Sequence, residues 1–116
     1  MNKVMLVGNL TADPEVRATP AGLYVAKLRL ATNQYAGKDD AGQAKKYTEY
    51  HHLVVFGKQA QFAGTHLRKG RSLAVEGRLQ TSSWEDAATG AKRWRTEVVV
   101  EQIEFAGAKP QEVAAA

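Results

Sequence analysis

Alternation of apolar and polar residues recurs along most of the chain, and this two-residue period is typical of β-strands with one buried face. The clearest case runs from Leu23 to Asn33, where the apolar side chains and the basic Lys27 and Arg29 fall on opposite faces. Other stretches are shorter apolar or β-branched runs that end in turn-forming residues. The sequence predicts five strands, at 3–10, 23–33, 47–57, 71–81 and 94–105. It also predicts a short edge strand from Glu15 to Ala18.

The segment GKQAQFAGTHLRKG, at 57–70, does not alternate and contains few β-branched residues. Phe62, Ala63 and Leu67 form a partial helical stripe, and Gly70 is suited to end a helix. We therefore expect a short helix between the third and fourth strands. The polar stretch AGKDDAGQAKK, at 36–46, predicts a mobile loop, and EDAATGAKR, at 85–93, predicts a hairpin loop.

The order of three strands, one helix and two strands predicts an all-β fold, a five-stranded OB-fold barrel. Such barrels bind oligonucleotides or oligosaccharides on a curved face, although the fold by itself does not define the function. A chain of 116 residues suits one domain. We expect the OB-fold domain to span 1–106 and a loose tail to occupy 107–116.

Composition and charge narrow the class of protein. The formal net charge is +4, a mild excess that fits a nucleic-acid binder without requiring one. Cysteine is absent, which excludes a disulfide framework, a cysteine zinc site and a thiol nucleophile. The apolar run near the N-terminus is too short for a signal peptide core or a membrane span. We expect a cytoplasmic protein that does not associate with a membrane.

Residues that could support catalysis or metal binding do not form a recognisable set. The chain has three histidines, and adjacent strand residues such as His51 and His52 face opposite ways. Neither a nucleophile elbow nor a phosphate-binding GxxxxGK or GxGxxG motif occurs. The sequence thus predicts a protein that is not an enzyme and holds no metal or cofactor.

Aromatic residues interleaved with basic residues favour binding to single-stranded nucleic acid, since bases stack on exposed rings and cations contact phosphates. Tyr50, His52 and Phe56 share one face of the strand at 47–57, and Trp84 lies in a polar stretch. Phe56 and Trp94 have a second interpretation as core residues, because most aromatic side chains are at least partly buried. The residues alone leave this choice open.

Several blocks of the sequence resemble bacterial single-stranded DNA-binding proteins. NKVMLVGNLTADPEVR is similar to the opening of that family, and LATN, TEYHHLVVFGKQA, HLRKG, VEGRLQTSSW and TEVVVEQIEF follow in the family's order. The resemblance spans about positions 2–106. It implies a homotetramer, built as a dimer of dimers, that wraps single-stranded DNA without reading its sequence. It also implies a role in protecting single strands during replication, recombination and repair.

The resemblance assigns stacking positions to Tyr50, Phe56 and Trp84. A further position falls near Tyr35, although ungapped spacing reaches Ala36 instead. His52 stands where the family commonly has arginine, and His51 corresponds to a residue near subunit contacts. The candidate phosphate contacts are the cations Arg17, Lys45, Lys46, Lys58, Lys69, Arg71, Arg78, Lys92 and Arg93. RNA is a second candidate ligand, because neither stacking nor phosphate contact requires DNA.

The C-terminal sequence GAKPQEVAAA departs from the family, whose usual members end in an acidic tip with a final aromatic residue that recruits other enzymes. We therefore do not expect tail-mediated recruitment; truncated, naturally tail-less and phage or plasmid forms all remain open. Two other interpretations remain: a dimeric OB-fold accessory protein of the primosome type, and an OB module that binds sugar or protein.

Overall fold

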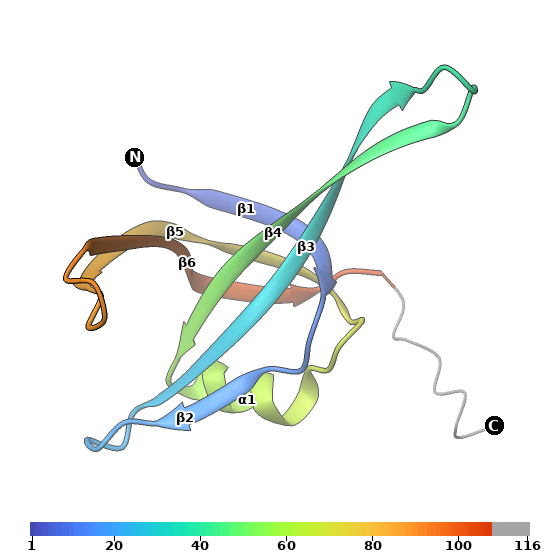
Figure 1. The fold of residues 1–116 in the computed structure, drawn as a ribbon. Coiled ribbons are helices and arrows are strands. Elements are labelled where there is room, and N and C mark those ends of the chain that lie inside the picture. The colour runs from blue at the N-terminus through green and yellow to red at the C-terminus, as the bar shows by residue number, and fades with distance from the viewer. Residues whose placement is uncertain (108–116) are drawn as a thin grey trace.

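One antiparallel-rich sheet closes on itself in the computed structural model, which describes residues 1–107 (Figure 1). Most of the tail expected at 107–116 thus lies outside the described residues. The elements, in chain order, are β1 (Val4–Leu10), β2 (Glu15–Ala18), β3 (Tyr24–Lys38), β4 (Ala44–Phe56), α1 (Lys58–His66), β5 (Ser72–Glu85) and β6 (Lys92–Phe105).

Closure of the barrel depends on β1, which pairs with two strands. The strand order is β1-β5-β6-β4-β3-β2, with an additional β1–β3 pairing. Val4 to Asn9 pair with β5, and Asn9 and Leu10 also pair with β3. Strands β1, β3, β4, β5 and β6 therefore form a closed five-stranded barrel, and β2 is an extra edge strand. This arrangement confirms the predicted OB-fold, and the short strand expected at Glu15 to Ala18 has those bounds.

The barrel interior is filled by aliphatic side chains, which come from alternate positions of the strands. Leu30 and Leu53 are fully buried, as are Ala60, Ala63 and Leu67 from α1 and the residue after it. The helix follows Gly57, whose φ of 69° suits glycine, and lies between β4 and β5 as expected. Within the described part of the chain, no helix is long and apolar enough to cross a membrane.

Two hairpin arms project from the barrel in different directions, one formed by β3 and β4 and the other by β5 and β6 (Figure 1). The mobile loop predicted at 36–46 was wrong in extent, because β3 continues to Lys38 and β4 begins at Ala44. A tight turn remains, in which the Asp39 carboxylate accepts hydrogen bonds from the backbone N–H groups of Ala41 and Gln43, both at 2.9 Å. The loop predicted at 85–93 is shortened in the same way, since β5 ends at Glu85 and β6 begins at Lys92.

Gly77 offers a test of how closely β5 and β6 approach each other. A Cβ placed at this residue would meet the backbone carbonyl of Val99, which cannot move without disturbing the β5–β6 pairing at the adjacent bulge. We predict that Gly77→Ala lowers the free energy of unfolding by about 1–3 kcal/mol, the usual cost of an overpacked site. Urea unfolding at one fixed protein concentration measures this loss of stability. Ser82→Ala, at an exposed residue of the same strand, is the matched control. Equal stability of the two variants would contradict the packing.

Candidate nucleic-acid interface

The predicted stacking residues of β3 and β4 lie on the side of the sheet that faces away from the barrel core. Residues directly opposite each other in neighbouring strands point to the same face. Arg29 lies opposite His52, and Tyr35 lies opposite Lys46. Tyr50 and Phe56 occupy the same side of β4, since they are separated from His52 by even numbers of residues. We call this surface the outer face.

The outer face continues from β4 onto the second arm. Val54 pairs with Val99 of β6, and Val99 pairs with Arg78 of β5. Farther along this arm, Arg93 lies opposite Trp84. The register thus brings Trp84, which is 28 residues beyond Phe56 in the sequence, to the same face as the aromatic residues of β4.

The exposure of these rings decides between the core and surface interpretations of the aromatic residues. Tyr35, Tyr50, Phe56 and Trp84 are respectively 61%, 54%, 44% and 46% exposed. The core interpretation of Phe56 is therefore wrong in this chain. Trp94 is also exposed, so it is not a core residue either, but its alternation with Arg93 places it on the opposite face of the arm.

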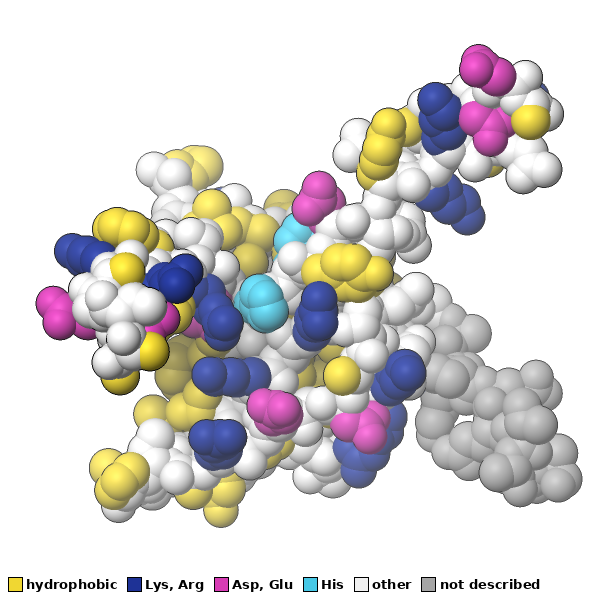
Figure 2. Space-filling view, in the orientation of Figure 1, with side chains coloured by type: hydrophobic (Ala, Val, Ile, Leu, Met, Phe, Trp, Pro, Cys, Tyr) yellow, Lys and Arg dark blue, Asp and Glu magenta, His cyan; other side chains and the backbone are white. Residues whose placement is uncertain are grey.

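Cationic side chains surround the aromatic residues on the outer face. The Arg29 guanidinium lies 4.9 Å from the centroid of the Tyr50 ring, which leaves its positive charge beside a stacking surface. Lys27, Arg29, His52 and Arg95 line one open hollow, to which Asp13 and Glu15 contribute carboxylates. In Figure 2, Lys and Arg side chains gather around a histidine on the face presented by β3 and β4.

Three of these cations, Lys27, Arg29 and Arg95, were missing from the predicted site. Lys27 and Arg29 had a visible signal, because they alternate with buried Ala26, Leu28 and Leu30 along β3. Arg95 could be found only from the pairing that places β6 beside β4. The predicted residues that the structure brings to the outer face are Arg17, Tyr35, Lys46, Tyr50, His52, Phe56, Arg78, Trp84 and Arg93.

Five other predicted cations do not join this set. Lys45 and Lys92 lie on the opposite faces of their arms, because they alternate with Lys46 and Arg93. Lys58 is the first residue of α1, and Lys69 lies in the loop that follows the helix, where its backbone N–H donates to Asp13. Arg71 is half-buried.

The guanidinium of Arg71 is engaged in packing. It lies 4.0 Å from the centroid of the Phe105 ring, and its buried Nε has no hydrogen-bond partner among residues 1–107. Phe105 in turn packs on Phe62 of α1, with 5.8 Å between ring centroids. The position of Arg71 therefore supports the contact between β6 and the helix and does not extend the outer face.

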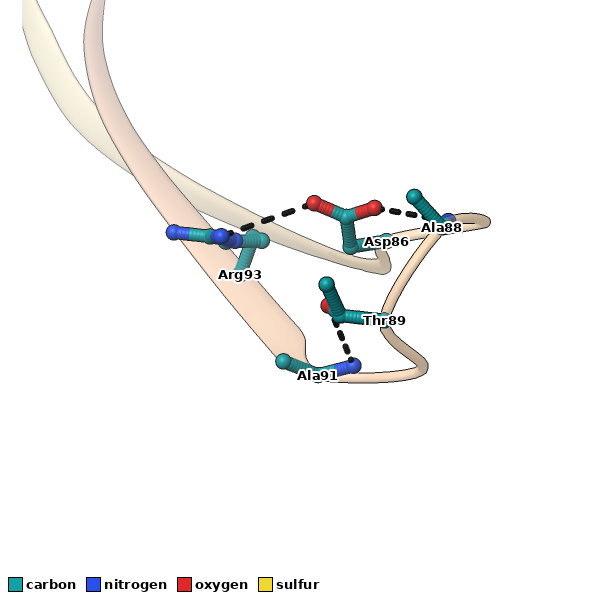
Figure 3. A network of polar contacts seen from close by, with 5 residues as sticks. All are labelled: Asp86, Ala88, Thr89, Ala91 and Arg93. Carbon is teal, nitrogen blue, oxygen red and sulfur yellow. Dashed lines mark hydrogen bonds and ion pairs between the residues drawn. The ribbon is translucent and has the colours of Figure 1, made fainter.

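The tip of the second arm is ordered by a small polar network (Figure 3). One Asp86 oxygen accepts a hydrogen bond from Ala88 N–H at 2.8 Å, and the other lies 3.5 Å from the Arg93 guanidinium. Thr89 Oγ1 accepts a hydrogen bond from Ala91 N–H. Because the ion pair is long and the Arg93 side chain is exposed, the pair is weak, and Arg93 stays available to another anion.

Histidines and carboxylates do not create a metal site in the part of the chain that the structure describes: no group of three or more His, Cys, Asp or Glu side chains there could hold an ion. His51 is half-buried on the opposite face from His52, with its Nε2 atom 2.8 Å from Thr32 Oγ1. The two adjacent histidines therefore have separate environments, as their alternation in the strand requires.

Comparisons with known proteins find relatives of this chain by sequence and by fold. The profile of the Single-strand binding protein family matches residues 1–106. "Single-stranded DNA-binding protein 1" of Chlorobaculum tepidum is 45% identical over 109 residues, covering 94% of this chain and 67% of that protein. A Plasmodium falciparum SSB in complex with ssDNA superposes with a TM-score of 0.81 and 28% identity, over 92% of this chain and 96% of the other. A deletion mutant of the single-stranded DNA binding protein from Thermus aquaticus superposes with a TM-score of 0.78 and 37% identity. This match covers 94% of this chain and 52% of the Thermus aquaticus chain.

Neighbouring residues of β4 allow a test of the two faces by stability. We predict that Tyr50→Ala lowers the free energy of unfolding by less than about 1 kcal/mol, because its ring already contacts water. Leu53→Ala is the matched buried variant and should cost about 2–5 kcal/mol. Chemical denaturation followed by circular dichroism measures both. A loss for Tyr50→Ala as large as that for Leu53→Ala would show that Tyr50 is a core residue.

Proposed function

The chain belongs to the Single-strand binding protein family, whose function is binding of single-stranded DNA, and we propose that the outer face of the sheet is the surface that binds it. One observation carries the proposal. Tyr50 and Phe56 lie on β4 and Trp84 lies on the β5–β6 arm, yet all three rings are exposed on one face that also carries arginine and lysine side chains. A single strand presents the complementary groups, unpaired bases and a phosphate backbone.

The physical chemistry of this face favours affinity without sequence recognition. Every base has a π-face, so an aromatic ring can stack with any of them, and each stacked base contributes about 1–3 kcal/mol. Contacts from Arg29, Arg78 and Arg95 to phosphates release counterions from the strand, which makes affinity fall as salt rises. Duplex DNA keeps its bases stacked on each other, so it offers the phosphates without the stacking partners.

The expected assembly is that of the family, whose members are generally tetrameric. We propose that β1 supplies a subunit contact. Met5 and Val7 are exposed apolar residues of β1, and β1 pairs with β3 only at its last two residues. Its first half therefore leaves one edge unpaired within residues 1–107, which another subunit can cover. His51 stays a predicted subunit contact, on the face opposite to the stacking residues.

The biological role we propose is protection of single strands in replication, recombination and repair, in the cytoplasm and without enzymatic activity. RNA is a second ligand with the same groups to offer. The dimeric primosome-type interpretation is less favoured, because the chain matches the single-strand binding profile over residues 1–106. A native mass of two chains instead of four would favour it again.

Trp84 is the stacking residue whose removal tests the face most simply. We predict that Trp84→Ala weakens binding to labelled oligo-dT by about 1–3 kcal/mol, because the ring no longer stacks on a base. Fluorescence anisotropy of the labelled strand measures the affinity, with duplex DNA of equal length as the comparison ligand. Trp84→Phe is the matched control, and it should keep most of the affinity because it keeps an aromatic ring. Equal affinities of the wild type for oligo-dT and duplex, or an unaffected Trp84→Ala variant, would contradict the proposal.

The three cations that the structure adds to the predicted site give an independent test. Each of Lys27→Ala, Arg29→Ala and Arg95→Ala should reduce the steepness of log affinity against log salt by about 0.7 if the residue contacts one phosphate. Binding to oligo-dT at several salt concentrations measures this slope. Lys45→Ala is the matched control on the opposite face of the first arm and should leave the slope nearly unchanged. A larger effect from Lys45→Ala than from Arg29→Ala would place the strand on the other face.

A further inference from the structure

Trp94 is an exposed tryptophan that the outer face does not use. It lies on β6 opposite Ser83, whereas the neighbouring pair on the arm is Arg93 opposite Trp84. The two tryptophans thus occupy adjacent pairs but point to opposite faces of the same hairpin. Trp94 is 63% exposed, more than Trp84, although burial of so large an apolar surface is normally favourable.

Polar residues separate Trp94 from the barrel core. Between Trp94 and buried Val98, the hydroxyl groups of Thr81 and Thr96 lie 2.8 Å apart in a hydrogen bond across the arm. The cross-strand neighbour of Trp94 is a serine. A threonine pair therefore lies between the ring and the next apolar pair on its face, Leu79 opposite Val98, whereas the centre of a protein–protein contact is usually a contiguous apolar patch. A ring with polar neighbours is better suited to a single flat partner.

A cation lies beside this ring. The Lys92 ammonium is 5.7 Å from the centroid of the Trp94 ring, on the same face of the arm. A base stacked on the indole would place its phosphate within the range of such a charge, the same combination of ring and cation that Arg29 and Tyr50 provide on the outer face.

The shape of the second arm gives a strand access to both faces. β6 pairs with β4 only at Val98 and Val99, and β1 pairs with β5 no farther than Gly77. From Ser82 onward, the arm is therefore a two-stranded ribbon with both edges unpaired among the described residues. A flexible strand that has stacked on Trp84 can turn around an edge of the ribbon and reach its other face.

We propose that Trp94, with Lys92, forms a second stacking position for single-stranded nucleic acid on the reverse side of the β5–β6 arm. This inference rests on the proposed function, since it extends the path of the strand that the outer face binds. It adds a contact that the resemblance does not assign, and it gives a reason for an exposed tryptophan on the face without Trp84.

The test uses the fact that the chain has two tryptophans. In Trp84→Phe, Trp94 is the remaining tryptophan, so its fluorescence reports one position. Titration with a long oligo-dT, with binding followed in parallel by anisotropy of a labelled strand, should quench Trp94 fluorescence as the strand binds. Binding without a change in Trp94 fluorescence would overturn the inference and leave the proposed function standing. Absence of binding by the wild type and by Trp84→Phe would overturn both.

A second measurement separates stacking from other roles of Trp94. Trp94→Ala should weaken binding to long oligo-dT about fivefold or more, and Trp94→Phe should restore most of that loss. The native mass of Trp94→Ala should equal that of the wild type. A smaller assembly for Trp94→Ala would show that a second copy of the chain covers the ring, and this would overturn the inference.

Discussion

The parallel pairing of β4 with β6 is the constraint on which the binding surface depends. Two residue pairs, Leu53 with Val98 and Val54 with Val99, fix which side of the second arm continues the outer face of the first. Since side chains in a strand alternate with a period of two, a shift of one residue would move Trp84 to the side away from Tyr50. The buried positions Leu53 and Val98 hold this register, because the same shift would expose them to water. The same strand register thus buries the core residues and places the stacking residues on one face.

The barrel and its arms divide the structural and functional tasks. The barrel has a small aliphatic core closed at one side by α1, and this core positions the roots of both arms. The arms beyond it have water on both faces and are held by backbone pairing, cross-strand contacts such as Thr48 with Asn33, and tight turns. Exposed aromatic and cationic residues accumulate there at little cost to folding, since they are not required for the core. A rigid base with projecting two-stranded arms is suited to a long, flexible ligand.

Alternation and turn residues were enough to predict the barrel, the helix and even the edge strand at Glu15 to Ala18, because each of these has an amphipathic pattern or a clear boundary. The lengths of the arms could not be predicted in this way: from Gln34 to Lys38 and from Ala44 to Lys46, neither face is continuously apolar, so no apolar face marks a strand. The shared face of Tyr50, His52 and Phe56 could be predicted because the three residues lie on one strand. The position of Arg95 beside β4 and the packing of Arg71 on Phe105 could not, because both depend on pairing or packing between distant segments.

Photo-crosslinking to a halogenated oligo-dU strand tests the central claim most directly, namely that the outer face binds the strand. Tyr47 and Tyr50 are both exposed on β4, three residues apart, and lie on opposite faces of the same arm. Mass spectrometry of the crosslinked peptides distinguishes them within one sample, with no variant needed. We expect crosslinks at Tyr50, Phe56 and Trp84, and none at Tyr47. Crosslinking mainly at Tyr47 would show that the strand follows the opposite face of the arm, and it would contradict the account.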